Sequence, residues 1–172
     1  MSRRRTSFRR DERGTAAIEF ALMAPILIVL QLGSVELVKA FEAQRRIAHV
    51  AAAMADVVSQ GRTVSDAQLA DAMAAGPVLV DPLPTATLGL RIASMTANSS
   101  GVVSVDWQTS QNWNIAGGPS VPNGYLNANE SAIVADVSYD YTSPIRYIMP
   151  TTVRFVRHAY IRPRLSNQVA KI

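Results

Sequence analysis

The residues best placed to do chemistry lie near the start of the chain, between Gly14 and Phe20. Residues 16–35 form a run of 20 residues in which Glu19 is the only charged side chain. A helix of that length rises about 30 Å, which matches the hydrocarbon core of a bilayer. A carboxylate at the centre of such a helix costs about 2.5–3.5 kcal/mol. Glu19 therefore needs either a cation to pair with or a route to water.

The basic residues are concentrated ahead of this apolar run. The 172-residue chain has a net charge of +4. Residues 1–14 contain six arginines and two acidic residues, whereas residues 15–172 contain eleven basic and eleven acidic residues. The body therefore carries no basic excess to bind nucleic acid. A basic flank is typical of the cytoplasmic side of a membrane helix, so we expect the N-terminus in the cytoplasm and the chain beyond residue 39 outside it.

Two plainer interpretations of the apolar run are open. The run could be a cleaved secretory signal, but such signals have apolar regions of about 7–15 residues. The best small-residue site near its end, Val38-Lys39-Ala40, has a lysine in the middle. The run could also be an uncleaved membrane anchor, because Glu19 lies near enough to the cytoplasmic interface to snorkel toward water.

The order of residues across this junction resembles a known processing signal. A basic head is followed by the pattern R-G-x-x-x-x-E-[FY]-A-L-x-x-P. Its fixed positions are Arg13, Gly14, Glu19, Phe20, Ala21, Leu22 and Pro25. The pattern is similar to the class III signal of type IV pilin-like proteins, and most closely to TadE-like minor pseudopilins of the tight-adherence (Tad/Flp) pilus. The segment from Ala159 to Arg164 resembles the ending of that family.

The resemblance implies that a prepilin peptidase cuts between Gly14 and Thr15 on the cytoplasmic face. Glycine suits the position before the cut, since a residue without Cβ lets the backbone lie extended in an active site. The cut would remove the whole basic excess and leave a neutral product of 158 residues. The resemblance further implies that Glu19, followed by Phe20, pairs with the N-terminal ammonium of a neighbouring subunit. That pairing would compensate the charge and select the register of assembly.

Pro25 lies inside the apolar run. Proline has no N–H and its ring clashes with the carbonyl four residues earlier, so we expect a kink or local unwinding there. The resemblance implies that such flexibility aids extraction from the bilayer, although prolines in membrane helices are also simply tolerated. The run becomes more polar at its outer end, at Gln31, Gly33, Ser34 and Glu36. This fits either contacts with partner helices or emergence into the interface.

The helix is expected to continue beyond the membrane through residues 40–60, which contain no Gly or Pro, and to stop at Gly61. Ile47, Val50, Met54 and Val57 recur at spacings of three, four and three, which predicts one apolar face packed on a globular head.

A second helix is predicted from Asp66 to Ala75. Ser65 can cap it, with Gln68 at the capping-box position. The pair Gly76-Pro77 is expected to end it.

The sequence then changes to a period of two, which predicts strands. Residues 88–93 and 103–108 are expected to form a hairpin around the turn at residues 98–101. A third strand is expected over residues 135–141 with one buried face, and a fourth over Val153 to Ile161. Residues 109–130 are expected to form a long exposed loop, which with Trp107 and Trp113 at its edge is a candidate contact surface.

No catalytic constellation, cofactor motif or metal-ligand spacing is recognisable in the sequence. The chain has no cysteine, so it can have no disulfide, thiolate metal site or cysteine nucleophile. His49 and His158 have no nearby partner in the sequence. Asp106, Asp136 and Asp140 are interpreted as a solvated strand face rather than a calcium site. The C-terminal arginines at positions 154, 157, 162 and 164 are expected to pair with such carboxylates or with an acidic partner.

These observations predict an α+β, pilin-like protein: a long N-terminal helix packed on a small antiparallel sheet. We expect a leader at residues 1–14, a transmembrane helix at 15–38 and an extracytoplasmic head at 39–172. The expected function is that of a minor pseudopilin of the inner membrane and periplasm, which supports pilus assembly, adhesion and biofilm formation and is not an enzyme. The expected partners are the prepilin peptidase, other pilins, the assembly platform and membrane lipid. The alternative is an uncleaved bitopic protein whose head binds something unrelated.

Overall fold

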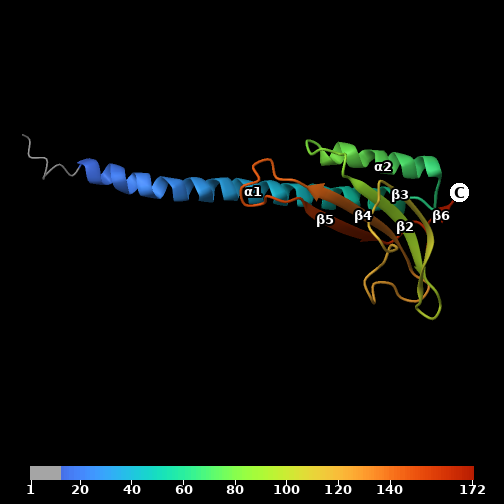
Figure 1. The fold of residues 1–172 in the computed structure, drawn as a ribbon. Coiled ribbons are helices and arrows are strands. Elements are labelled where there is room, and N and C mark those ends of the chain that lie inside the picture. The colour runs from blue at the N-terminus through green and yellow to red at the C-terminus, as the bar shows by residue number, and fades with distance from the viewer. Residues whose placement is uncertain (1–12) are drawn as a thin grey trace, which may run out of the picture.

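The computed structural model describes residues 13–172, so most of the predicted leader lies outside the described residues. Its elements are α1 (Arg13–Ser59), β1 (Thr63–Val64), α2 (Asp66–Val80), β2 (Gly89–Ala97), β3 (Val103–Gln111), β4 (Ser131–Tyr141), β5 (Val153–Ile161) and β6 (Ala170–Lys171). A long helix projects from a small α+β head (Figure 1), which confirms the predicted fold class.

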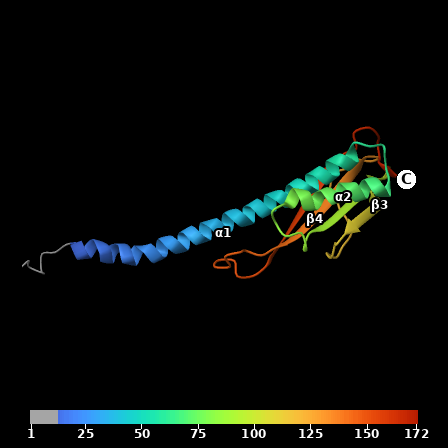
Figure 2. The same ribbon diagram turned by 90° about the horizontal axis from the view of Figure 1, so that it is seen from above.

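The sheet has the strand order β3-β2-β4-β5, and all its neighbouring strands are antiparallel. The predicted β2–β3 hairpin is confirmed, with Asn98 at its turn accepting bonds from the amides of Ser100 and Val102 on its side-chain oxygen. The C-terminal half of α1 packs across β4 and β5, and α2 lies beside α1 over the same face (Figures 1 and 2).

The C-terminal half of α1 supplies one apolar stripe to the core. Ile47 and Val50 are fully buried and Met54 is nearly so, as predicted. Val57, however, is 58% exposed, and Val58 takes the place predicted for it. A step of four after Met54 keeps the stripe pointing at the sheet, because α-helical spacing averages 3.6 residues a turn.

The start of α2 is as predicted, but its end is not. The Gln68 amide donates to Ser65 Oγ and the Ser65 amide donates to Gln68 Oε1, which is a complete capping box. The helix then continues through Pro77 to Val80 instead of stopping at Gly76. Val80 is fully buried, so its packing offsets the one helical bond that Pro77 cannot donate.

Gly76 has a packing role. A Cβ added there would lie 2.8 Å from Leu90 Cδ1 on β2. The missing side chain therefore lets α2 approach the sheet closely.

The central strand β4 is buried on both faces, whereas one buried face was predicted. One face carries Ile133, Ala135 and Val137 into the core beneath α1. On the other face, Ala132 packs with Leu126 from the segment between β3 and β4. That segment therefore folds back over the sheet.

The last strand, β6, lies near the C-terminal end of α1. Thr63 in β1 pairs in parallel with Ala170 in β6. The Arg164 amide also donates to the Ser59 carbonyl at 3.0 Å. These bonds tie the C-terminal segment to the end of the long helix.

Candidate processing and assembly segment

The N-terminal half of α1 exposes its apolar side chains. Ile18, Phe20 and Leu22 are all more than 60% exposed. The most apolar 18-residue window of the helix has a mean hydropathy of 2.0, and only 11% of it is buried. A core helix of a water-soluble protein would bury such a window, so α1 is a candidate single membrane span.

Gly14 lies in the first turn of α1, where the predicted cleavage site begins. A Cβ added at Gly14 would meet no atom within 4 Å, so nothing described crowds this position. The backbone is helical here rather than extended, so the predicted cut would require this turn to unwind. Glycine at this position favours such opening, because it is a poor helix former.

Glu19 lies about one helical turn beyond Thr15, and its side chain is exposed. Phe20 beside it is 69% exposed. Both side chains are therefore accessible to another molecule approaching the N-terminal half of the helix. The structure places them where an assembly contact could use them, and their predicted role stays a prediction.

Helix α1 runs through Pro25 without a break. Figure 2 shows its axis changing direction in the exposed N-terminal part, shown in blue. Local unwinding at Pro25 therefore does not occur, and the predicted link between this residue and extraction from the bilayer stays a prediction.

Comparison with protein families gives one match to this helix. Residues 14–56 match the family of TadE-like proteins. The match covers the exposed half of α1 and most of the half that packs on the sheet, and it confirms the resemblance carried by the N-terminal pattern. It indicates a component associated with the Tad pilus. Searches among curated proteins and among solved structures gave no match.

Glu36 is a functional candidate that sequence reasoning missed, and it lies in the helix that this family matches. Its side chain is fully buried. Its carboxylate accepts hydrogen bonds from Ser143 Oγ at 2.5 Å and from the amides of Tyr147, Ile148 and Met149 at 2.9, 2.6 and 3.2 Å. These partners lie more than 100 residues away along the chain, so no local spacing could have revealed them.

A second buried carboxylate lies on the opposite face of the sheet. Asp136 is 1% exposed, contrary to the predicted solvated face. Its oxygens accept from Arg91 Nε at 2.8 Å and Nη2 at 2.5 Å, and one lies 2.7 Å from His158 Nδ1. His158 therefore has a partner, since β4 and β5 place Asp136 directly opposite it.

Arg91 also fastens the segment between β3 and β4. It donates from Nη1 to the Gly117 carbonyl at 2.7 Å, and the ring of Trp113 lies 4.5 Å from its Cζ. Trp107, within β3, donates its indole N–H to the Val169 carbonyl. Both tryptophans thus have contacts within the head, which weakens the prediction that they mark a binding surface.

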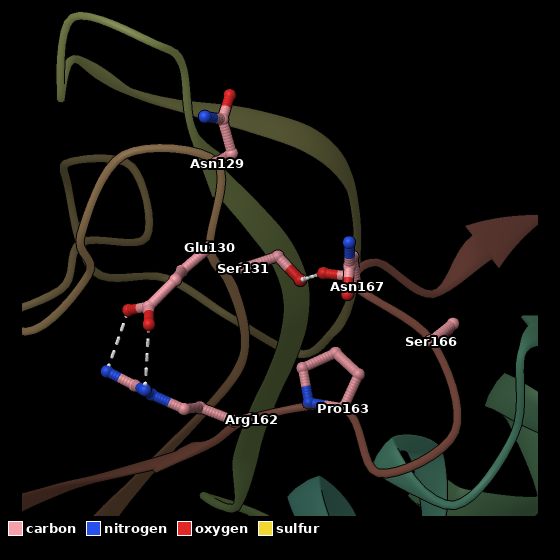
Figure 3. A pocket seen from close by; sticks show the side chains of 7 residues that line it. All are labelled: Asn129, Glu130, Ser131, Arg162, Pro163, Ser166 and Asn167. Carbon is pink, nitrogen blue, oxygen red and sulfur yellow. Dashed lines mark hydrogen bonds and ion pairs between the residues drawn. The ribbon is translucent and has the colours of Figure 1, made fainter.

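A small pocket of about 170 Å³ lies where the end of this segment and the start of β4 meet the loop between β5 and β6 (Figure 3). Glu130 and Arg162 face each other across its edge, 2.8 Å apart. Ser131 Oγ, which also lines the pocket, donates to the Asn167 carbonyl. The charges of Glu130 and Arg162 already pair with each other. We therefore interpret the pocket as a junction between segments rather than as a ligand site.

Of the other C-terminal arginines, Arg154 pairs as predicted, with two hydrogen bonds of 2.5 and 2.7 Å to Asp140. Arg164 pairs instead with Asp56 on α1, which is not one of the predicted strand carboxylates. Arg157 instead donates to the carbonyl of Val156. Within residues 13–172, no group of three or more His, Asp or Glu side chains is arranged to hold a metal ion.

Proposed function

We propose that this chain is a minor pseudopilin of a Tad-type pilus, made as a precursor and cut by a prepilin peptidase between Gly14 and Thr15. The family match over residues 14–56 carries the proposal, since its first residue is the glycine before the cut. Hydrolysis adds water across one peptide bond, leaving a carboxylate on Gly14 and an α-amino group on Thr15.

The charge distribution supports an orientation for this precursor. All of the net positive charge precedes Thr15, and α1 behind it is long and apolar enough to cross a bilayer once. The leader therefore stays on the cytoplasmic side of the inner membrane, and the head lies in the periplasm or on the pilus. From there the protein supports pilus biogenesis and adhesion.

Glu19 then pairs with a newly formed α-amino group. An ammonium of a neighbouring subunit at the depth of Glu19 would compensate its charge within the apolar assembly, where an unpaired carboxylate is costly. Only one axial register brings the two groups together. The pair therefore selects how subunits stack.

Mass spectrometry of the protein from its native membrane tests the processing step. We expect a mature N-terminus at Thr15, and we expect Gly14→Leu to abolish the cut because a bulky side chain cannot enter the site that glycine fits. Thr15→Ser is the matched control and should be processed normally. A mature N-terminus at Met1 in the unaltered protein, or normal processing of the Gly14→Leu variant, would contradict the proposal.

The second candidate is an uncleaved bitopic protein whose head binds an unrelated partner. It is favoured by the same exposed apolar helix, which anchors the chain whether or not it is cut. The mass of the mature protein separates the two functions.

A further inference from the structure

We propose that residues 143–149, here called the Glu36 loop, form a second membrane contact that lies in the outer headgroup region and fixes how deeply α1 is inserted. The inference rests on the proposed function in one respect, since it requires α1 to span the membrane. It does not require cleavage or a pilus.

The Glu36 loop is held firmly against α1. It connects β4 to β5 and runs beside α1. It extends from the main body of the head toward the N-terminal half of α1 (Figures 1 and 2). Ser143 and three successive amides, those of Tyr147, Ile148 and Met149, bind the buried carboxylate of Glu36. Four hydrogen bonds to one charged group give the loop a defined position along the helix axis.

The loop backbone is shaped for this contact. Arg146 has a positive φ of 56°, a conformation that non-glycine residues rarely adopt. Successive amides after such a residue form a concave site that binds an anion. Here the Glu36 carboxylate occupies that site, so the loop geometry is built around the helix.

The depth of the loop follows from its contact with Gly33. A Cβ added at Gly33 would collide with Ile148 Cδ1, so the isoleucine side chain rests on the glycine backbone. Gly33 lies two residues before the end of the apolar run at residue 35. Two residues rise about 3 Å in a helix, so Ile148 lies at the level where the run leaves the bilayer core.

The side chains on this loop suit a lipid interface. Ile145 is 37% exposed, Ile148 is 50% exposed and Tyr147 is 58% exposed. Arg146 between them is also exposed. Tyrosine places its ring at headgroup level, and arginine keeps its charge beside phosphates while its stem lies along apolar groups. Exposure of the two isoleucine side chains to water is unfavourable, whereas contact with lipid would remove their apolar surface from water.

Lipid is the occupant that this position requires. A loop fixed against Gly33 lies at the bilayer surface whenever α1 spans the membrane, because the helix and the loop are joined through Glu36. A protein partner would need an additional surface that meets the loop at the same depth. The lipid is present at that depth already.

A fluorescent probe on the full chain tests the placement. The protein has no native cysteine, so single-cysteine variants can be labelled cleanly. Tyr147→Cys reports on the loop, Leu27→Cys on the span and Val102→Cys, at the distant hairpin turn, on the aqueous phase. Each is reconstituted in vesicles of phosphatidylcholine and phosphatidylglycerol with a quencher near either the glycerol end or the methyl end of the acyl chain.

The Tyr147 probe should lose most of its emission to the quencher near the glycerol end and little to the one near the methyl end. The Leu27 probe should show the opposite order, and the Val102 probe should respond to neither. A Tyr147 probe that behaves like Val102 while Leu27 is quenched would overturn the inference and leave the anchor intact. A Leu27 probe that neither quencher affects would show that α1 does not span the membrane. That result would overturn both this inference and the proposed function.

Contact with a protein instead of lipid gives a different result. In that case the Tyr147 probe would be shielded from an aqueous quencher yet insensitive to both lipid quenchers, which would also overturn the inference.

Glu36→Gln tests whether the helix holds the loop in place. The amide keeps the size of the side chain but loses the charge and one acceptor oxygen. We expect the Tyr147 probe to lose its quenching near the glycerol end while the Leu27 probe is unchanged. Glu42→Gln is the matched control, since Glu42 is an exposed acid on the same helix. Unchanged quenching in the Glu36→Gln variant would show that the carboxylate does not position the loop.

Discussion

Three carboxylates of this chain show how differently one functional group can be used. Glu19 is exposed on the projecting helix, Glu36 is buried against backbone amides, and Asp136 is buried against an arginine and a histidine. In the sequence, Glu19 lies within the apolar run, Glu36 lies directly after it, and Asp136 lies in an alternating strand pattern. Their surroundings distinguish them, because burial makes a charge depend on its partners.

Removing the charge of Asp136 should destabilise the head strongly. Asp136→Asn leaves the Arg91 guanidinium buried beside a neutral amide, and losing one partner of a buried ion pair costs about 3–5 kcal/mol. Denaturant unfolding of the full chain in detergent measures the free energy of unfolding. Asp140→Asn on the same strand is the control, because its pair with Arg154 is partly exposed and should contribute less than about 1 kcal/mol. Equal losses in the two variants would contradict the assigned role of Asp136.

Acid should weaken the head through its surface pairs. Hydrogen bonds from Arg154 lower the pKa of Asp140, and hydrogen bonds from Asn127, with the nearby Arg162 charge, lower the pKa of Glu130. A lowered folded-state pKa adds stability above the unfolded value, about 3.9 for Asp and 4.3 for Glu, and that stability is lost as the pH falls through the folded pKa.

The denaturant concentration at the midpoint of unfolding should therefore decrease as the pH is lowered below about 4. The double variant Asp140→Asn with Glu130→Gln should be less stable at pH 7 and show a shallower fall. If the double variant and the unaltered protein follow the same pH curve, these two groups do not carry the dependence.

At the scale of elements, the close approach of the strands depends on small residues. A Cβ at Gly89 would lie 2.8 Å from the Asn112 carbonyl oxygen and closer still to Ser138 Oγ. Gly89→Ala should therefore cost about 1–3 kcal/mol by overpacking. Gly118→Ala, where an added Cβ meets no atom within 4 Å, should change stability by less than about 0.5 kcal/mol. Thermal unfolding compares the two, and a Gly89 variant as stable as the Gly118 variant would contradict this account.

Local patterns predicted the elements well where a single local rule decides the outcome. The capping box at Ser65 starts α2, and the boundaries of β5 are those expected from its alternation. Packing overrode local rules elsewhere. Pro77 did not end α2, because burial of Val80 keeps the helix going.

The missed features depend on contacts between distant segments. The burial of Asp136 requires the segment after β3 to fold back over the sheet and Arg91 to reach its carbonyls. The Glu36 site requires the turn between β4 and β5 to lie against α1. Nothing in the spacing of nearby residues encodes either contact, whereas the candidate segment at Gly14, Glu19 and Pro25 was recognisable because its pattern is continuous in sequence.

At the scale of the whole molecule, the two halves of α1 suit different solvents. The most exposed large apolar side chains include Phe20 and Leu22 on the projecting half, whereas Ile47 and Val50 are buried in the head. A chain of residues 36–172 should therefore be monomeric in water without detergent, while the full chain should require detergent or lipid.

Sedimentation without detergent checks this division. A further truncation to residues 51–172 removes Ala43, Ile47 and Val50 from the core, so it should unfold or aggregate. Aggregation of the 36–172 chain under conditions that keep its circular dichroism intact would show that the projecting half does not carry most of the exposed apolar surface.

The bond from Tyr147 to Glu36 spans 111 positions of the sequence. Contacts of such long range form slowly, because a large loop must close before they contribute. The Glu36 loop joins β4 to β5, so we expect these strands to pair before it can meet the helix. In time, then, α1 leaves the ribosome well before the Glu36 loop does, and its contact with the loop is among the last to form. A newly made chain would pass through an interval in which its head is folded but the Glu36 loop is not yet bound to α1.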